Sequence, residues 1–135
     1  MKMKKRWMSS VLVAASLFVA ALPAQASQYV DMDEYSSSTL QSTYQSGNSI
    51  YVSIYNYAPN YNWGDIQWEV IDGYSNVIAS GTAYNPYDVG NHPTIPGSYY
   101  EGTIAIDGNN QNQAKLVLTC TTGRCSGSGY IEGSW

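Results

Sequence analysis

Aromatic side chains are the residues of this sequence whose type and spacing most directly indicate a binding site. The stretch SIYVSIYNYAPNYNWGDIQW, residues 49–68, is dense in tyrosine and tryptophan. Strand alternation places Trp68 toward a core and places Tyr51, Tyr55 and Tyr57 on one outer face. Tyrosine favours half-exposed strand positions, and it also supplies rigid contact area with a polar edge. Packing and ligand binding therefore both stay open as roles for these strand tyrosines.

Rings in turn-rich segments are stronger candidates for ligand contact, because loop side chains cannot all reach a core and loops often carry function. The candidate ligand-binding residues are Tyr57, Tyr61, Trp63, Tyr84 and Tyr87. The first three flank the turn at Pro59. Asn and Gln neighbours add hydrogen-bonding groups, so these rings predict a surface for a carbohydrate or a cell-surface protein partner.

Carboxylates are the main candidates for catalysis, because a glycosidase needs two of them at a defined separation. Those around the aromatic segment are Asp65, Glu69, Asp72 and Glu101. The sequence sets no separation for them across strands. Ser128 in SGSGY lacks the strand and helix that flank a nucleophile elbow, and His92 is the single histidine. We therefore predict no catalytic residues and a protein that is not an enzyme.

Oxygen ligands for calcium are a weaker possibility, and no other cofactor is indicated. Asp31 and Asp33 share one face of a predicted strand, and Asp107 begins the turn DGNN. Neither segment has the spacing of an EF-hand loop. Turn chemistry alone explains Asp107 and is the favoured interpretation, and acidic residues on an edge strand prevent edge-to-edge pairing.

The two cysteines, Cys120 and Cys125, lie in the short segment CTTGRC. An even number of cysteines in an exported chain predicts a disulfide. The loop is small, so its entropic contribution is about 2 kcal/mol in the chain-entropy model. Its expected role is to close a turn that contains Gly123.

Residues 1–26 have the features of a cleavable signal peptide of bacterial style. A basic start precedes the apolar run 11–22, and Ala24-Gln25-Ala26 matches the small-x-small cleavage rule. The run is short for a membrane span. We therefore predict cleavage after Ala26, a single secreted domain over residues 27–135, and no membrane span after cleavage.

Charge excludes some classes of partner. Four of the six basic residues lie in the predicted signal peptide, which leaves Lys115 and Arg124 against ten acids and a net charge of about −8. Phosphate backbones and anionic membrane surfaces would repel such a chain. Nucleic acid is therefore not an expected partner.

Short apolar alternations separated by Gly, Asn, Ser and Pro predict an all-β fold. The predicted strands are residues 28–35, 50–57, 66–71, 77–84, 99–107, 114–120 and 129–135. They suit a small two-sheet antiparallel β-sandwich, Ig-like or jelly-roll-like, with about 6–8 short strands and one local disulfide. Ile131 and Trp135 are expected to share the buried face of the last strand.

Three functions are consistent with these features. The main interpretation is a secreted, non-catalytic binding module that uses its Tyr and Trp surface. The alternative is a structural or self-associating protein of an extracellular matrix. The second alternative is a small secreted toxin, inhibitor or hydrolase.

Overall fold

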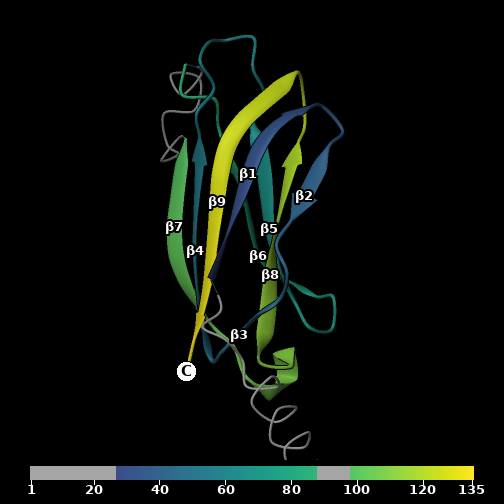
Figure 1. Ribbon diagram of the computed structural model, residues 1–135, viewed down its shortest axis with the longest axis vertical. Helices are drawn as coiled ribbons and strands as arrows, with labels where there is room; N and C mark the ends of the chain where they lie inside the picture. Colours follow the sequence, from purple (N-terminus) through teal and green to yellow (C-terminus); the bar gives the residue numbers. More distant parts are fainter. Residues whose placement is uncertain (1–26, 88–97) are drawn as a thin grey trace, which may run out of the picture.

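The computed structural model describes residues 27–87 and 98–135, which form two antiparallel sheets packed face to face (Figure 1). Sheet A has the order β1 (Ser27–Tyr35), β9 (Arg124–Ser134), β4 (Ser49–Asn56) and β7 (Tyr99–Ala105). Sheet B has the order β2 (Thr39–Gln41), β8 (Gln113–Cys120), β5 (Ile66–Asp72) and β6 (Val77–Ala83). The two-residue strand β3 (Gln45–Ser46) also pairs with β8.

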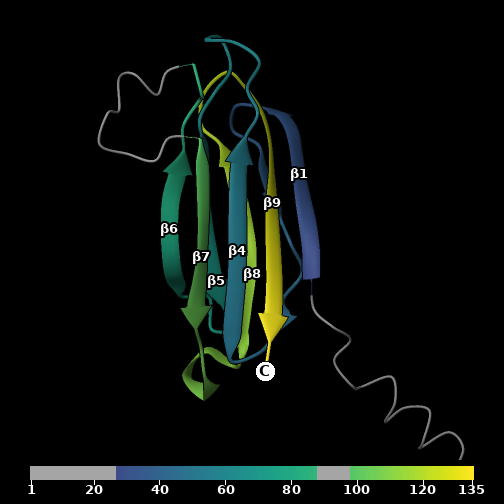
Figure 2. The same cartoon turned by 90° about the vertical axis from the view of Figure 1, so that its left-hand side faces the viewer.

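The strand pairing is nested from the ends of the chain toward its middle. Strand β1 pairs with β9, β2 with β8, β4 with β7, and β5 with β6. In Figure 2, β7, β4 and β9 lie in front of β5 and β8, so the two sheets form two layers. This nested, two-layer arrangement is a jelly roll, which confirms the predicted β-sandwich and decides between its two predicted variants.

The core lies between the sheets and follows the predicted alternation. Ile50, Val52 and Ile54 of β4 are fully buried, as are the inward residues of β8. Trp68 of β5 is 4% exposed and stacks on Tyr100 of β7, with ring centroids 4.4 Å apart. This aromatic pair therefore joins sheet B to sheet A across the core.

Strand β9 is longer than the predicted strand, which was expected to begin at Gly129. It begins at Arg124 and includes the segment CSGSG. Its glycines face inward, where a Cβ on Gly129 would lie 2.6 Å from Leu116 Cδ2. Glycine usually weakens a strand, but here it allows β9 to lie close against sheet B.

Two further predictions about the strands were wrong. The described residues contain nine strands rather than 6–8, because the short β2 and β3 have too few residues to show alternation. Ile131 is buried as expected, but Trp135 lies beyond the end of β9 and is 70% exposed. The ring of Trp135 therefore does not contribute to the core.

Two predicted turns are confirmed. Cys120 and Cys125 form the disulfide, and both are fully buried. Residues 73–76 join β5 to β6 as a hairpin, and buried Asp72 holds this turn by accepting hydrogen bonds from the backbone N–H groups of Tyr74 and Asn76. A third donor is the Asn110 side chain, 2.9 Å from Asp72 Oδ2.

The Asp72 carboxylate makes the stability of the protein depend on acid pH. The hydrogen bond from Asn110, helped by those from Asn76 and Tyr74, lowers the pKa of Asp72 below its ordinary value of 3.8, although burial opposes this. A lowered pKa stabilises the fold above the ordinary carboxyl pKa, and the stabilisation is lost as pH falls through the folded-state pKa. Chemical unfolding of wild type and Asp72→Asn between pH 2 and 7 should show a steeper acid loss for wild type. Identical pH profiles would contradict this role.

Candidate functional site

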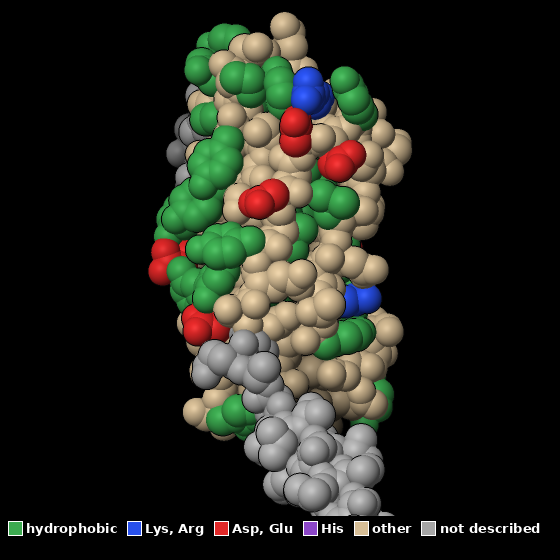
Figure 3. Space-filling model, viewed as in Figure 1, with side chains coloured by type: hydrophobic (Ala, Val, Ile, Leu, Met, Phe, Trp, Pro, Cys, Tyr) green, Lys and Arg blue, Asp and Glu red, His purple; other side chains and the backbone are tan. Residues whose placement is uncertain are grey.

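The outer face of sheet A gathers tyrosines from all four of its strands. We call this set the tyrosine face, and its members are Tyr29, Tyr51, Tyr55, Tyr57, Tyr99 and Tyr130. Pairing register brings them together: Tyr29 lies opposite Tyr130 on β9, and Tyr55 lies opposite Tyr99 on β7. Figure 3 shows hydrophobic side chains, tyrosine among them, in a column along the left side of the molecule.

The rings of the tyrosine face form two contacting groups. In one group, Tyr130 lies 4.8 Å from Tyr29 and 6.0 Å from Tyr51, measured between ring centroids. In the other, Tyr55 stacks on Tyr99 at 4.7 Å and lies parallel to Tyr57 at 5.8 Å. Ring contacts of this kind stabilise one another, so the face is a preorganised surface rather than a set of independent side chains.

A depression of about 540 Å³ lies between the two groups of rings. Its lining consists of Tyr29, Tyr51, Ser53, Tyr55, Tyr57, Ser128 and Tyr130. Ser53 and Ser128 are cross-strand neighbours of tyrosines on β9 and β4. Small serine side chains at these positions leave space between the rings and offer hydroxyl groups to a ligand.

Carboxylates and burial act on the phenol groups of the tyrosine face. Tyr99 donates a hydrogen bond to Glu101, and this contact raises the pKa of Tyr99 above its ordinary value of 10.0. Burial raises the pKa of Tyr51, and a hydrogen bond with Glu101 raises it further. Burial also raises the pKa of Tyr130. These phenols therefore stay protonated at neutral pH and can donate hydrogen bonds.

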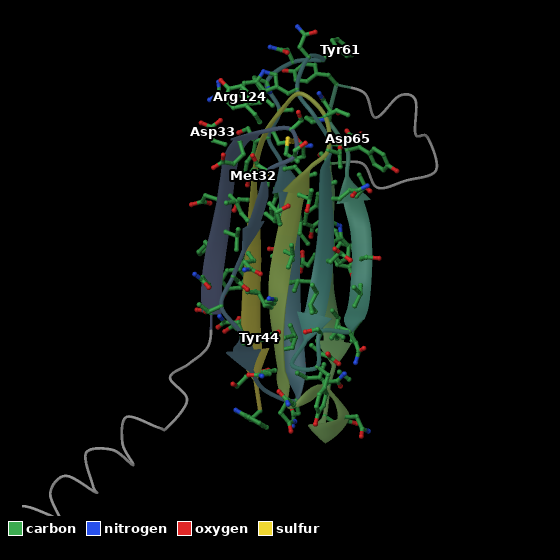
Figure 4. All side chains as sticks on the ribbon, turned by 90° about the vertical axis from the view of Figure 1, so that its right-hand side faces the viewer. Met32, Asp33, Tyr44, Tyr61, Asp65 and Arg124 are labelled. Carbon is green, nitrogen blue, oxygen red and sulfur yellow. A yellow bond between two sulfur atoms is a disulfide. The ribbon has the colours of Figure 1, made fainter. Side chains whose placement is uncertain are left out.

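A second aromatic group, the tip cluster of Tyr61, Trp63 and Tyr87, lies at one end of the sandwich. Tyr61 and Tyr87 are in contact at 5.6 Å between ring centroids, and Tyr61 is 73% exposed (Figure 4). Trp63 is half-buried, and the guanidinium carbon of Arg124 lies over its ring at 4.8 Å from the ring centroid. A smaller depression of about 350 Å³ is lined in part by Tyr57 and Tyr87.

Asn85 holds the two loops of the tip cluster together. Its side-chain Nδ2 donates to the backbone carbonyls of Asn60 and Trp63, and its Oδ1 accepts from the backbone N–H of Tyr87. Its own backbone N–H donates to Asp65 at 2.7 Å. The side chain is buried at 2% exposure, so these partners have no solvent to replace it.

Replacing Asn85 with alanine should lower the free energy of unfolding by about 1–3 kcal/mol, because buried carbonyls lose their donors. Trp63 fluorescence should shift as its loop moves. Chemical denaturation measures the first effect, with Asn62→Ala as the control because Asn62 is exposed on the same loop. Equal stability of the two variants would contradict the assignment.

The structure brings together four of the five predicted ligand-binding residues. Tyr57 lines both depressions, and Tyr61, Trp63 and Tyr87 make up the tip cluster. The fifth, Tyr84, is half-buried just after β6. Tyr57 therefore links the predicted loop site to the larger tyrosine face.

The sequence did not single out Tyr29, Tyr99 and Tyr130 as site residues. They lie far from residues 49–68 in the chain, and only the register of β1, β9, β4 and β7 places them beside Tyr51 and Tyr55. The period-two pattern of β1 and β7 marks these positions as outward-facing. Alternation gives no information about which strands are neighbours.

The carboxylates considered for catalysis do not share a site. Glu69 lies on the outer face of sheet B, whereas Glu101 lies on the outer face of sheet A. Asp72 is buried in its hairpin turn, and Asp65 accepts the backbone N–H of Asn85. The single histidine, His92, lies outside the described residues.

The weak calcium candidates are engaged in other contacts or isolated. Asp33 forms an ion pair with Arg124 at 2.8 Å. Asp107 accepts the backbone N–H of Asn109 at the start of the 3-10 turn Gly108–Asn110. Within residues 27–87 and 98–135, no three His, Cys, Asp or Glu side chains are grouped so as to hold a metal ion.

Comparison with known proteins identifies no family. No protein-family model and no curated protein matches the chain. One solved structure, titled "Bacillus endospore appendages form a novel family of disulfide-linked pili", aligns over 83% of this chain and 88% of its own, with 11% identity and a TM-score of 0.46.

A second solved structure is the infectious bursal disease virus VP2 subviral particle. It aligns over 84% of this chain and 33% of its own, with 10% identity and a TM-score of 0.37. At these values, neither similarity assigns a function to this chain. Fold and surface together define a jelly-roll domain with an aromatic outer face.

In the part of the chain that the structure describes, no helix has the length and apolar character needed to cross a membrane.

Proposed function

We propose that this protein is an exported, non-catalytic binding module that uses the tyrosine face as its contact surface, with a carbohydrate or a cell-surface protein as its partner. The observation that carries the proposal is the gathering of five tyrosines around one depression, from β1, β9, β4 and the residue just after β4, with Tyr99 of β7 stacked beside them on Tyr55. Tyrosine is enriched at binding surfaces because it offers large contact area with few rotatable bonds.

Burial in the core does not explain the tyrosine face. Tyr29, Tyr57 and Tyr99 are all exposed, and the inward positions of the same strands already fill the core. Solvent-exposed aromatic groups of this size are uncommon on a protein that acts alone, and they often mark sites of interaction. Tyr29 and Tyr99 lie on paired strands, which fix them more firmly than loop residues would be fixed.

A capture experiment with residues 27–135 tests the proposal. The immobilised protein is exposed to cell-wall material, soluble polysaccharides and spent medium, beside the double variant Tyr55→Thr/Tyr130→Thr. Threonine keeps strand propensity and removes the rings. We expect capture by wild type and at least a tenfold loss in the variant. Equal capture by both folded proteins would overturn the proposed function.

Self-association is a second candidate function, and strand β6 is the observation that favours it. Strand β6 lies at an edge of sheet B, and its sequence VIASGTA has no charged residue or proline. Strand β1, an edge strand of sheet A, is protected by contrast, because it carries the charged residues Asp31, Asp33 and Glu34. An unprotected edge can pair with the same edge of a second copy. The similarity to the appendage protein is too low to support this candidate.

Sedimentation velocity over a range of concentrations tests self-association. A wild-type chain that assembles through β6 should form larger species as concentration rises, and Ser80→Lys should keep it monomeric, since an edge lysine opposes pairing. A Thr103→Lys control places the same charge on β7 of sheet A. A monomeric wild type at high concentration would remove this candidate.

A further inference from the structure

The depression in the tyrosine face is bordered by carboxylates. Asp31 lies opposite Ser128, Glu132 lies opposite Tyr51, and Glu101 lies opposite Ser53, each across one strand pair. We propose that the depression binds cationic side chains, lysine or arginine, of a protein partner. This inference rests on the proposed function, because it names the chemistry of the ligand for the same face.

The arrangement suits a cation for two reasons. A lysine ammonium or an arginine guanidinium group is attracted to the face of an aromatic ring within about 6 Å of its centre. Carboxylates at the border add charge-assisted hydrogen bonds to the same group. The depression offers rings as walls and Asp31, Glu101 and Glu132 at its margin, so one cationic side chain could use both interactions.

The molecule already contains one arginine bound in this way. The guanidinium group of Arg124 pairs with Asp33 at 2.8 Å, and it lies over the rings of Tyr35 and Trp63 at 5.4 and 4.8 Å from their centroids. Figure 4 shows Arg124 and Asp33 side by side near the tip. This internal contact combines aromatic rings and a carboxylate, and Arg124 lies on β9, the strand that also contributes Ser128 and Tyr130 to the depression.

The protein has no cation of its own at the depression among the described residues. Of its two cations outside residues 1–26, Arg124 is held by Asp33, and Lys115 on sheet B lies over the ring of Tyr44 at 5.1 Å. The charges of Asp31, Glu101 and Glu132 are therefore not balanced by a neighbouring lysine or arginine. A partner with positive charge would supply that balance.

Charge also separates this partner from other occupants of the face. A second copy of the chain would bring the same carboxylates toward Asp31 and Glu132, and like charges across an interface weaken association. A neutral oligosaccharide could stack on the rings, but it would gain little from the three carboxylates. A basic protein segment is complementary to both the rings and the charges.

Calorimetric titration of residues 27–135 with a lysine decapeptide, blocked at both ends, tests the inference. The comparison ligands are the same peptide acetylated on every side chain, chitohexaose and cellohexaose. We expect binding of the lysine peptide, at least tenfold weaker binding of its acetylated form, and affinity that falls with salt because the contacts are ionic. Failure of the lysine peptide to bind would overturn the inference.

Paired variants separate the face from a general attraction to an acidic protein. Glu132→Gln should weaken binding about three- to fivefold, as expected for a partly exposed ion pair, whereas Glu69→Gln on sheet B should change it less than twofold. Tyr29→Thr/Tyr55→Thr should weaken binding about five- to tenfold without any change in net charge. Equal effects of the two Glu variants, or no effect of removing the rings, would overturn the inference.

The outcomes also separate this inference from the proposed function. The acetylated peptide or a neutral oligosaccharide could bind as tightly as the lysine peptide, and Tyr29→Thr/Tyr55→Thr could abolish that binding. In that case the tyrosine face is a binding surface, but its ligand is not cationic. If capture from natural material is unaffected by removal of the rings, the proposed function itself is wrong.

Discussion

Replacing Trp68 with alanine should lower the free energy of unfolding by about 3–5 kcal/mol, the range measured for large aromatic side chains in cores. The ring packs across the two sheets against Tyr100, and it lies flat on Gly81 of β6, where a Cβ would approach its Cζ2 to 2.7 Å. Gly81, which lies against the ring, has no side chain to fill the resulting cavity. Chemical denaturation followed by circular dichroism measures the change.

Trp135→Ala is the matched control, because this ring is exposed and makes no part of the core. Its effect should stay within about 0.5 kcal/mol, as for most surface substitutions. A similar loss in both variants would show that Trp68 does not join the two sheets. A loss of less than 1 kcal/mol for Trp68→Ala would lead to the same conclusion.

Gly64→Ala should be the most damaging single-methyl change, with a loss of about 1–3 kcal/mol or more. A Cβ at this position would lie 1.8 Å from the backbone oxygen of Thr122 and 3.0 Å from Cys125 Sγ. The glycine N–H donates to the carbonyl of Arg124 at 2.7 Å, so the backbone cannot move away without losing this bond. The variant should also disturb the neighbouring Trp63 and the tip cluster.

Gly108→Ala is the control for this substitution, because no atom lies within 4 Å of the Cβ it would add. An alanine there should leave stability nearly unchanged or raise it by a few tenths of a kcal/mol. Thermal unfolding of both variants is a sufficient comparison. Comparable melting temperatures for Gly64→Ala and wild type would show that the two loops are less tightly packed than the structure indicates.

Alternation in the sequence predicted the core well. The burial of Ile50, Trp68 and Leu116 follows from period-two patterns within single strands, and each pattern was long enough to give a phase. The disulfide and the β5–β6 hairpin are local features, so their residues were recognisable from short segments. Local signals therefore predicted seven of the nine strands in the described residues, and they predicted the inward side of β4, β5 and β8.

Long-range pairing could not be predicted from the same patterns. Tyr29 and Tyr130 are separated by most of the chain, yet β1 and β9 place them in one cross-strand pair. The glycines of β9 also concealed its length, because they read as a turn-rich segment and not as positions of close packing. The loop rings could therefore be recognised as candidates, but the larger face to which Tyr57 belongs could not.

The tyrosine face and the tip cluster form one continuous surface through Tyr57. This ring lies parallel to Tyr55 on the tyrosine face, and it also lines the smaller depression with Tyr87. A partner seated in the larger depression could thus extend toward the tip. Substitution of Tyr61 or Tyr87 should weaken binding less than substitution of Tyr55 and Tyr130, because Tyr55 and Tyr130 line the larger depression.

Hydroxyl-radical labelling of tyrosine rings, read by mass spectrometry, tests the central claim most directly. The labelling compares the free protein with its complex with whichever of the lysine decapeptide, chitohexaose or cellohexaose binds. We predict protection of Tyr29, Tyr55 and Tyr57 and unchanged labelling of Tyr74, which is 56% exposed in the β5–β6 turn on sheet B. Protection of Tyr74 with no protection of the tyrosine face would contradict the claim that this face is the binding surface.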